Sequence, residues 1–326
     1  MMKEIERLGK ERLVFGAEST TEDVITGVNL NGKTALVTGA SAGLGMETAR
    51  VLAAAGAEVW LVGRDEAKLV KAREIIVADV PAAVLFIAVL DLADLNSVRR
   101  GAAEILSRCS CIDILINNAG IMACPEACTE QGFELQFGTN HLGHFLLTGL
   151  LLPLLKAAGN CRVVNLSSAG HKYCSIDFDD LDFKKRGYDK WLSYGQAKTA
   201  NALFSVALTE RFSSQGVVAN AVHPGAIVTE LGRHLTPEDI KSMSDATSPK
   251  PKFIYKSISQ GAATSVWAAT CDELEGVGGL YLEDCQIAEL ASDSDPAKGF
   301  MAYAVDSEQA KKLWQVSEQL VGDKFG

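Results

Sequence analysis

Short apolar segments alternate with longer segments of helical periodicity along most of the chain. The apolar segments at residues 34–38, 58–62, 84–89, 112–116, 162–166, 217–222 and 279–282 predict strands. Residues 45–55, 66–77, 96–108, 192–212 and 260–270 predict helices, and another long helix falls within residues 132–156. Almost continuously apolar strands require cover on both faces of a sheet. The pattern therefore predicts an α/β fold: a Rossmann-type, doubly wound parallel sheet of about seven strands with helices on both faces.

Three segments depart from this alternation. Residues 1–30 read as an N-terminal extension in which residues 3–13 could form a helix. Residues 229–257 are polar and proline-containing, which is typical of an insertion that covers a site. Residues 293–326 form a tail with a helix expected at residues 307–321. We expect residues 31–326 to form one domain, with the insertion acting as a lid.

Charge and composition exclude several classes of function. The net charge of −10 argues against nucleic-acid binding and against docking on anionic lipid. The longest apolar run, residues 145–155, is interrupted by Thr148, Gly149 and Pro153 and is too short to be a membrane span. The eight cysteines lack the paired spacing of a metal site, so no metal is expected. Without a secretory leader at the N-terminus, the sequence predicts a cytoplasmic protein with reduced thiols.

A glycine cluster joins the first strand to the first helix. It reads Thr38-Gly-Ala-Ser-Ala-Gly-Leu-Gly45, and glycine removes the Cβ atoms that would keep a phosphate from the backbone. The following helix offers free N–H groups and a positive dipole end to a pyrophosphate. Its place between strand and helix predicts a dinucleotide site.

The end of the second strand favours NADP(H) over NAD(H). An NAD-binding enzyme usually has a carboxylate there for the ribose 2′-hydroxyl, but this chain has Gly63 followed by Arg64. Ser41 could add a hydroxyl to the same 2′-phosphate. Asp65 is displaced by one residue, and we expect it to cap the helix that begins at Glu66.

A tyrosine and a lysine lie four residues apart at the start of a long helix. This spacing places Tyr194 and Lys198 on one helix face, where an ammonium would stabilise a phenolate and lower the pKa of the tyrosine. Ser168 ends the fifth strand, at the edge of the sheet where ligands bind. The fourth strand ends in Asn117-Asn118-Ala119-Gly120 at the same edge, and Asn140 is an unusual amide inside a long helix.

These motifs, in this order, resemble the short-chain dehydrogenase/reductase superfamily over about residues 31–285. They include the glycine cluster, Asp91-Leu92, the asparagine-rich strand end, Ser168, Tyr194 to Lys198, and His223-Pro-Gly225 with Thr229. The sequences Asn140-His-Leu-Gly-His-Phe and Tyr194-Gly-Gln-Ala-Lys-Thr-Ala-Asn201, with the acidic insert at residues 178–183, resemble the retinol-dehydrogenase-like branch.

The resemblance implies a role for each matching residue. Tyr194 would be the acid/base, Ser168 would polarise the carbonyl, Lys198 would hold the nicotinamide ribose, and Asn140 would keep a water in a proton relay. Ser167 is the alternative serine. The expected cofactor-binding residues are Gly39, Ser41, Gly43, Leu44, Gly45, Arg64, Asp91, Leu92, Asn118, Ala119, Gly120, Tyr194, Lys198, Pro224, Gly225 and Thr229.

The sequence leaves three functions open. The first is an NADP(H)-dependent alcohol dehydrogenase or carbonyl reductase acting on a hydrophobic ketone, aldehyde or alcohol. The second is an NADP(H)-sensing binding protein without meaningful turnover, and the third is a light-driven pigment reductase. The resemblance also implies a homodimer or homotetramer formed through the two long helices, which the tail could block or extend. His141 and His144 are expected to pack in the core, and His171 lies either in the substrate pocket or in a surface loop.

Overall fold

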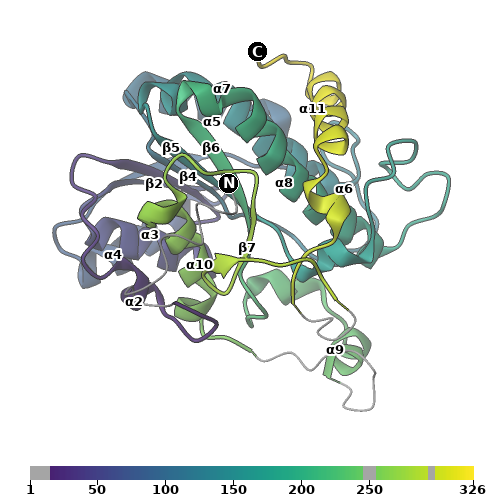
Figure 1. Ribbon diagram of the computed structural model, residues 1–326, viewed down its shortest axis with the longest axis horizontal. Coiled ribbons are helices and arrows are strands. Elements are labelled where there is room, and N and C mark those ends of the chain that lie inside the picture. The colour runs from purple at the N-terminus through teal and green to yellow at the C-terminus, as the bar shows by residue number, and fades with distance from the viewer. Residues whose placement is uncertain (1–14, 245–254, 293–297) are drawn as a thin grey trace.

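The computed structural model describes residues 15–244, 255–292 and 298–326, which contain one sheet in the order β3-β2-β1-β4-β5-β6-β7-β8 (Figure 1). The strands are β1 (Thr34–Thr38), β2 (Glu58–Gly63), β3 (Val84–Val89), β4 (Ile114–Asn117), β5 (Cys161–Leu166), β6 (Val217–His223), β7 (Tyr281–Glu283) and β8 (Gln286–Ile287). Strands β1 to β7 pair in parallel, whereas β8 is antiparallel to β7. The doubly wound parallel fold is confirmed. The added strand β8 has two residues, too few to show a periodic pattern in the sequence.

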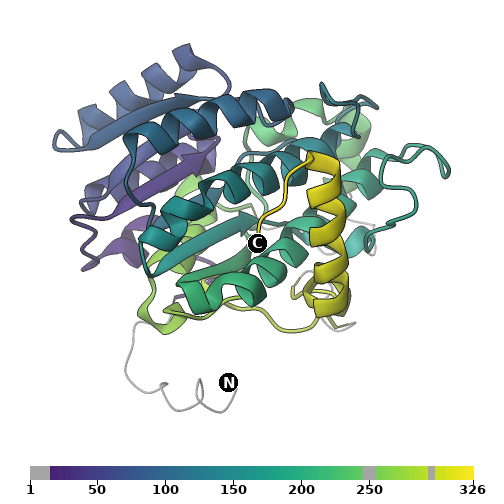
Figure 2. The same cartoon turned by 90° about the horizontal axis from the view of Figure 1, so that it is seen from above.

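Helices cover both faces of this sheet, as Figures 1 and 2 show. On one face lie α2 (Thr21–Ile25), α3 (Gly43–Ala54), α4 (Glu66–Asp79) and α10 (Ile258–Thr270). On the other lie α5 (Leu95–Arg108), α7 (Gly143–Ala157) and α8 (Lys190–Phe212), with α11 (Ser307–Val321) packed against α8.

Alternate strand residues contribute to two separate cores. Leu36 and Trp60 pack in the core with α5, α7 and α8, while their neighbours Val37 and Leu61 pack in the core with α3 and α10. Successive side chains of a strand point to opposite faces, so both sets must be apolar. This explains why the strands carry no alternation of polar and apolar residues.

Several element boundaries differ from those expected. The first long helix begins at Gly43 rather than residue 45, and the fourth strand begins at Ile114 rather than residue 112. Ile112 is buried, which explains why the apolar pattern included it. It does not belong to the strand, because its N–H donates to the carbonyl of Leu154 and not to a neighbouring strand. The last parallel strand begins at Tyr281, since the positive φ of Gly279 turns the chain before it.

The helix expected within residues 132–156 is interrupted. A short helix α6 (Leu135–Phe137) is followed by a π-helical turn η1 (Gly138–Leu142), which leads into α7. A single π turn inserts one extra residue into a helix and is frequent at functional sites. Asn140 lies in this turn.

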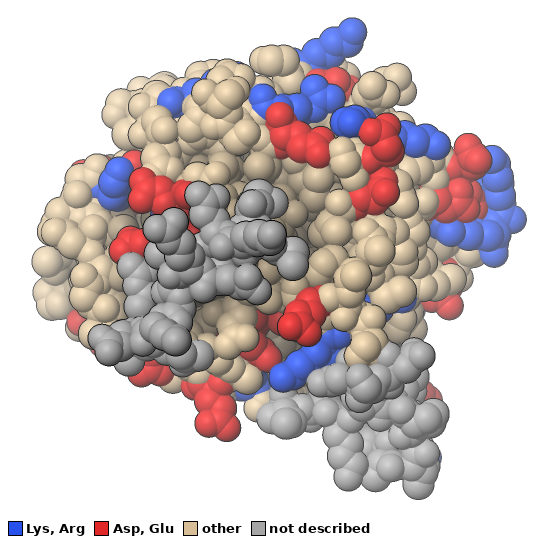
Figure 3. All heavy atoms as spheres, viewed as in Figure 1, with Lys and Arg blue, Asp and Glu red and all other residues tan. Residues whose placement is uncertain are grey.

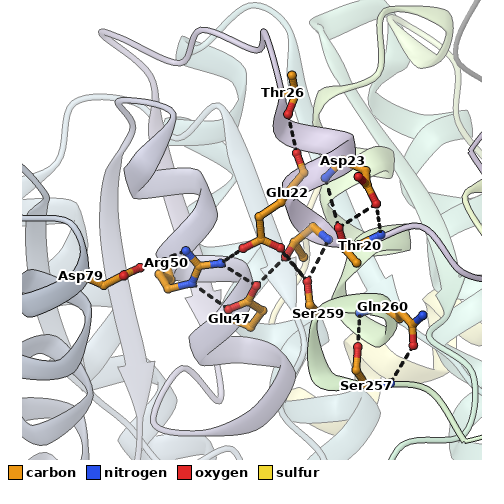
Figure 4. Close-up of polar contacts among 11 residues, drawn as sticks. Thr20, Glu22, Asp23, Thr26, Glu47, Arg50, Asp79, Ser257, Ser259 and Gln260 are labelled. Carbon is orange, nitrogen blue, oxygen red and sulfur yellow. Dashed lines mark hydrogen bonds and ion pairs between the residues drawn. The ribbon is translucent and has the colours of Figure 1, made fainter.

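The segment before β1 is anchored to the domain. Thr20 caps α2, and α2 packs against α3 and α10. Glu22 and Glu47 both pair with Arg50, and Glu22 also accepts a hydrogen bond from Ser259 of α10 at 2.8 Å (Figure 4). The helix expected at residues 3–13 lies outside the described residues.

The insertion and the tail both contain helices. The insertion begins with a 3-10 turn η4 (Glu230–His234) and α9 (Pro237–Ser244), while residues 245–254 lie outside the described residues. The tail helix α11 has the expected bounds. Acidic and basic side chains are interspersed over the face of the molecule in Figure 3. Within the described residues, no helix has the length and apolar character needed to span a bilayer.

Candidate active site

The loops after β1 and β4 meet at the carboxyl edge of the sheet. The order of the strands reverses between β1 and β4, which is where open α/β sheets bind ligands. Thr38 connects the two loops, because its hydroxyl oxygen accepts from the N–H groups of Asn118 at 2.9 Å and Ala119 at 3.0 Å. A Cβ on Gly39 would lie 2.9 Å from the Cα of Ala119, and one on Gly45 would lie 2.4 Å from the carbonyl oxygen of Gly39. Only glycine fits these two positions.

A cleft of about 710 Å³ opens above this junction. Most of the expected cofactor residues line it: Gly39, Ser41, Gly43, Leu44, Gly45, Arg64, Asp91, Leu92, Asn118, Ala119, Gly120 and Thr229. Pro224, Gly225, Tyr194 and Lys198 do not line it. The N-terminus of α3 begins at this cleft, and Ala42 provides no side-chain cap for its first N–H groups. Free N–H groups at a helix N-terminus suit a phosphate, so a dinucleotide fits the chemistry of these residues.

Basic side chains gather at the β2 side of the cleft. Arg64 follows β2, Lys68 and Lys71 lie on the first turns of α4, and Arg233 comes from η4 of the insertion. Sequence reasoning found Arg64 but missed the other three. The spacing of Arg64, Lys68 and Lys71, four and then three residues apart, is the pattern of one helix face and could have indicated the lysines. Arg233 is brought here only by the tertiary structure.

Tyr194 and Ser168 both lie next to Gly170. A Cβ on Gly170 would be 2.8 Å from Cε1 of Tyr194 and 3.5 Å from Oγ of Ser168. Tyr194 is 3% exposed, whereas Ser168 is half-buried. Ser167 has a different role, since its hydroxyl donates to the backbone carbonyl of Lys198 at 2.9 Å. The geometry therefore favours Ser168 over Ser167 as the partner of Tyr194.

The electrostatics of the tyrosine–lysine pair differ from the expectation. Burial raises the pKa of Tyr194 to about 12, and the hydrogen bond with Ser168 opposes this increase. Lys198 donates through Nζ to the carbonyl of Leu166 at 2.8 Å, and burial lowers its pKa to about 8. Burial of the phenol thus opposes the lowering of the Tyr194 pKa that was expected from Lys198.

Asn140 and Lys198 converge on Gly120. A Cβ on Gly120 would lie 3.1 Å from Oδ1 of Asn140 and 3.7 Å from Nζ of Lys198. The Asn140 amide accepts from the N–H of Ile121 at 2.8 Å and donates to the carbonyl of Ile121 at 2.9 Å. The side chain of Asn140, in the π turn, therefore bonds to the loop after β4, which accounts for an amide in a buried position.

The remaining predicted residues lie at the base of the insertion and in the core. Thr229 caps η4 through its hydroxyl, and Gly225 has a φ of +94° beside the side chain of Lys256. His141 contacts Ser317 of the tail, and His144 lies 2.9 Å from the hydroxyl of Thr38. Within the described residues, no group of side chains has the composition of a metal site. His171 is buried, so the expectation of a surface loop is wrong.

Comparison with known proteins defines the class. Residues 33–239 match the family described as short chain dehydrogenase. The chain is 40% identical to retinol dehydrogenase 13 of Homo sapiens over 315 residues, which cover 95% of this chain and 92% of the relative. It belongs to the short-chain dehydrogenase/reductase family and is therefore an oxidoreductase by family.

The relatives also place the chain within that family. Human retinol dehydrogenase 14 is 41% identical over 90% of this chain and 87% of its own length, and the chain belongs to the retinol-dehydrogenase-like branch. A crystal structure of an uncharacterised protein from Mycobacterium paratuberculosis superimposes with a TM-score of 0.72 at 35% identity, covering 95% of this chain and 99% of that one. The NADP active-site complex of RhlG from Pseudomonas aeruginosa superimposes with a TM-score of 0.61 at 25% identity, covering 78% and 95%.

Proposed function

We propose that this protein is an NADP(H)-dependent oxidoreductase that interconverts a hydrophobic ketone or aldehyde and its alcohol. The observation that carries the proposal is the convergence of Ser168 and Tyr194 on Gly170 and of Asn140 and Lys198 on Gly120. Gly120 itself lines the cleft, and Nζ of Lys198 lies 5.6 Å from the centre of the Tyr194 ring, so the two pairs adjoin each other beside a cleft that suits a dinucleotide. This placement is what proton transfer to a bound carbonyl oxygen requires.

Each of the four side chains has a chemical task in this proposal. The nicotinamide of the cofactor supplies or accepts the hydride. Tyr194 gives its proton to the substrate oxygen during reduction, and its raised pKa keeps the phenol protonated at neutral pH. Ser168 donates a hydrogen bond to the same oxygen as charge develops there. Lys198 holds the cofactor ribose, and Asn140 belongs to the path by which Tyr194 regains its proton.

Charge supports NADP(H) as the cofactor. Arg64, Lys68, Lys71 and Arg233 all line the β2 side of the cleft in a chain whose net charge is −10. A 2′-phosphate is the group on the adenosine side of the cofactor that would use such a concentration of cations. Binding of NADP by the Pseudomonas aeruginosa relative is consistent with this assignment.

The insertion supports a hydrophobic substrate. Ile240 and Tyr255 are apolar side chains exposed on it, and Val228, which is also exposed, immediately precedes it and adjoins Thr229 at the cleft. We propose that residues 229–257 form a lid on a catalytic domain of residues 31–326 and that these side chains face the substrate. The relatives are named for retinol, which is a hydrophobic alcohol.

The tail covers the surface through which the resemblance implies that a second copy binds. In α11, Trp314 packs against Phe145 of α7 with ring centroids 5.0 Å apart and against Phe204 of α8 at 6.1 Å. The tail therefore covers part of the two long helices that were expected to bind a second copy. We propose that any dimer uses another surface, which sedimentation of the wild type and of a Trp314→Ala variant would test.

The deciding experiment is oxidation of NADPH, with NADH in parallel, against a panel of hydrophobic ketones and aldehydes in the dark. We expect faster turnover with NADPH, and we expect Tyr194→Phe to reduce kcat by at least ~100-fold, the usual contribution of a general acid. NADPH affinity should stay unchanged in this variant. Near-normal turnover of Tyr194→Phe would contradict the proposal. Tight NADPH binding without turnover on the whole panel would favour a sensing protein, and activity only in light would favour a pigment reductase.

A further inference from the structure

Three donors converge on the backbone carbonyl oxygen of Ser168. The N–H of His171 donates to it at 3.0 Å, Nδ1 of the His171 ring lies 2.6 Å from it, and the hydroxyl of Tyr281 donates to it at 3.0 Å. A carbonyl oxygen has two lone pairs, so these donors saturate it, and the Tyr281 hydroxyl also lies 3.1 Å from Nδ1 of His171. The peptide group that carries Ser168 is thereby held in one orientation.

The far side of the His171 ring is bound to the tail. The N–H of Met301 donates to Nε2 of His171 at 3.1 Å. Because Nε2 accepts this hydrogen bond, the ring proton is on Nδ1, which then donates to the carbonyl of Ser168. The ring is fully buried, and burial lowers the pKa of His171 to about 4, so the imidazole is neutral at physiological pH.

The backbone of His171 joins two more elements to this cluster. Its carbonyl accepts from the hydroxyl of Tyr303 at 2.8 Å and lies 3.2 Å from the hydroxyl of Thr199, which also contacts the carbonyl of Cys174 at 2.8 Å. Tyr303 belongs to the tail, and Thr199 follows Lys198 on α8. One histidine therefore connects the loop of Ser168, the helix of Lys198, β7 and the tail.

We propose that His171 is a positioning residue that holds Ser168 in place for catalysis and makes the tail at residues 300–305 part of the active-site framework. The inference rests on the proposed function, in which Ser168 hydrogen-bonds the substrate oxygen. His171 is not among the residues that line the cleft. It acts through the Ser168 peptide, whose orientation also sets the direction of the hydroxyl that faces Tyr194.

Three substitutions separate the two hydrogen bonds of the ring. His171→Asn keeps a donor at the position of Nδ1 and loses the acceptor for Met301. His171→Gln keeps an acceptor at the position of Nε2 and loses the donor to Ser168. His171→Phe keeps the volume of the ring and loses both.

We expect His171→Phe to lower kcat by ~10- to 100-fold, because a misplacement of about 1 Å near the chemistry can have an effect of that size. His171→Asn should recover most of this loss and His171→Gln much less, with KM and NADPH affinity similar in all three. Thermal unfolding is measured alongside. The inference is wrong if the decrease in kcat across the variants merely parallels their loss of thermal stability. It is also wrong if His171→Asn and His171→Gln have the same kcat, because His171 then only fills space.

The contribution of the tail is tested by Tyr303→Phe, which removes one hydroxyl and leaves the His171 ring intact. We expect a smaller decrease in kcat with an unchanged KM, whereas Gln315→Ala, an exposed position elsewhere in the tail, should match the wild type. An unchanged kcat in Tyr303→Phe would contradict a role for the tail. Failure of the proposed function can be distinguished from failure of this inference. An active Tyr194→Phe variant overturns the proposed function. An inactive Tyr194→Phe variant together with His171 variants of normal kcat overturns this inference alone.

Discussion

The carboxylate of Asp65 accepts a hydrogen bond from the backbone N–H of Lys68 at 3.1 Å and so caps the first turn of α4. This confirms the expected cap. A carboxylate that binds the ribose 2′-hydroxyl marks many NAD-binding sites, and here Asp65, which also lines the cleft, uses Oδ1 to cap a helix end. Arg64, the residue before it, remains beside Lys68 and Lys71 at the cleft.

The first prediction concerns Arg64. A hydrogen bond to a charged group contributes about 1.5–3 kcal/mol, so Arg64→Ala should reduce kcat/KM for NADPH by ~10- to 100-fold. The value for NADH should change much less. Arg73→Ala is the control, because Arg73 lies on α4, the helix that follows Arg64, but lines a separate groove along β3. Equal losses for both cofactors would show that Arg64 does not recognise the 2′-phosphate.

The layered fold could be predicted from the sequence because strands that are buried on both faces appear as short, almost continuously apolar segments. Residues 34–38 are apolar on both faces, and the structure places β1 there. The tail helix was predicted with its true bounds at residues 307–321, since its ends carry local signals. Asp306 caps the N-terminus, and Gly322 adopts the left-handed conformation that ends many helices.

Features set by tertiary packing could not be predicted in the same way. No pattern in residues 132–156 marks the π turn at Asn140, because the turn is stabilised by hydrogen bonds to Ile121 in another loop. Arg233 reaches the cleft only through the path of the insertion. The environment of His171 depends on a tail that lies more than a hundred residues later in the chain, as the separation of 130 from Met301 shows.

The second prediction is a pH dependence of stability that comes from Glu22. Burial opposes ionisation of this carboxyl group, but hydrogen bonds from Ser259, Thr21 and Arg50 outweigh it and lower its pKa to about 2 from the ordinary value of 4.5 (Figure 4). A depressed pKa in the folded state stabilises the protein above the unfolded value, and this stability is lost as pH falls towards the folded value. We therefore expect part of the stability to disappear between pH 4.5 and about 2.

Denaturant unfolding of a Glu22→Gln variant across this range measures the effect. The variant should be less stable than the wild type at pH 7, and the difference should shrink as the pH falls to about 2. Glu18→Gln removes a carboxylate from the same segment without removing the partner of Arg50 and serves as the control. A difference between Glu22→Gln and wild type that stays constant with pH would refute the assignment.

The third prediction concerns Trp314 of the tail helix. Its ring is 2% exposed and packs against Phe145 and Phe212, so Trp314→Ala should lower the free energy of unfolding by about 3–5 kcal/mol. Its Nε1 has no hydrogen-bond partner within the described residues. Trp314→Phe should therefore lower the free energy of unfolding much less than Trp314→Ala, because it removes a buried, unpaired donor together with part of the ring. Urea unfolding tests both, and similar losses for Phe and Ala would contradict this explanation.

The last prediction concerns Gly170, which lies next to both Ser168 and Tyr194. A methyl group at residue 170 would lie 2.8 Å from Cε1 and 2.9 Å from Cδ1 of Tyr194, closer than carbon atoms in contact approach. The ring is buried, and Oγ of Ser168 lies only 3.5 Å from the same methyl position. Gly170→Ala must therefore displace the side chain of Tyr194. We expect kcat to fall by ~100-fold, as for a misplacement of about 1 Å, with NADPH affinity preserved. Gly16→Ala is the matched control, since a Cβ there meets nothing within 4 Å. Full activity of Gly170→Ala would mean that the position of the Tyr194 ring does not limit catalysis.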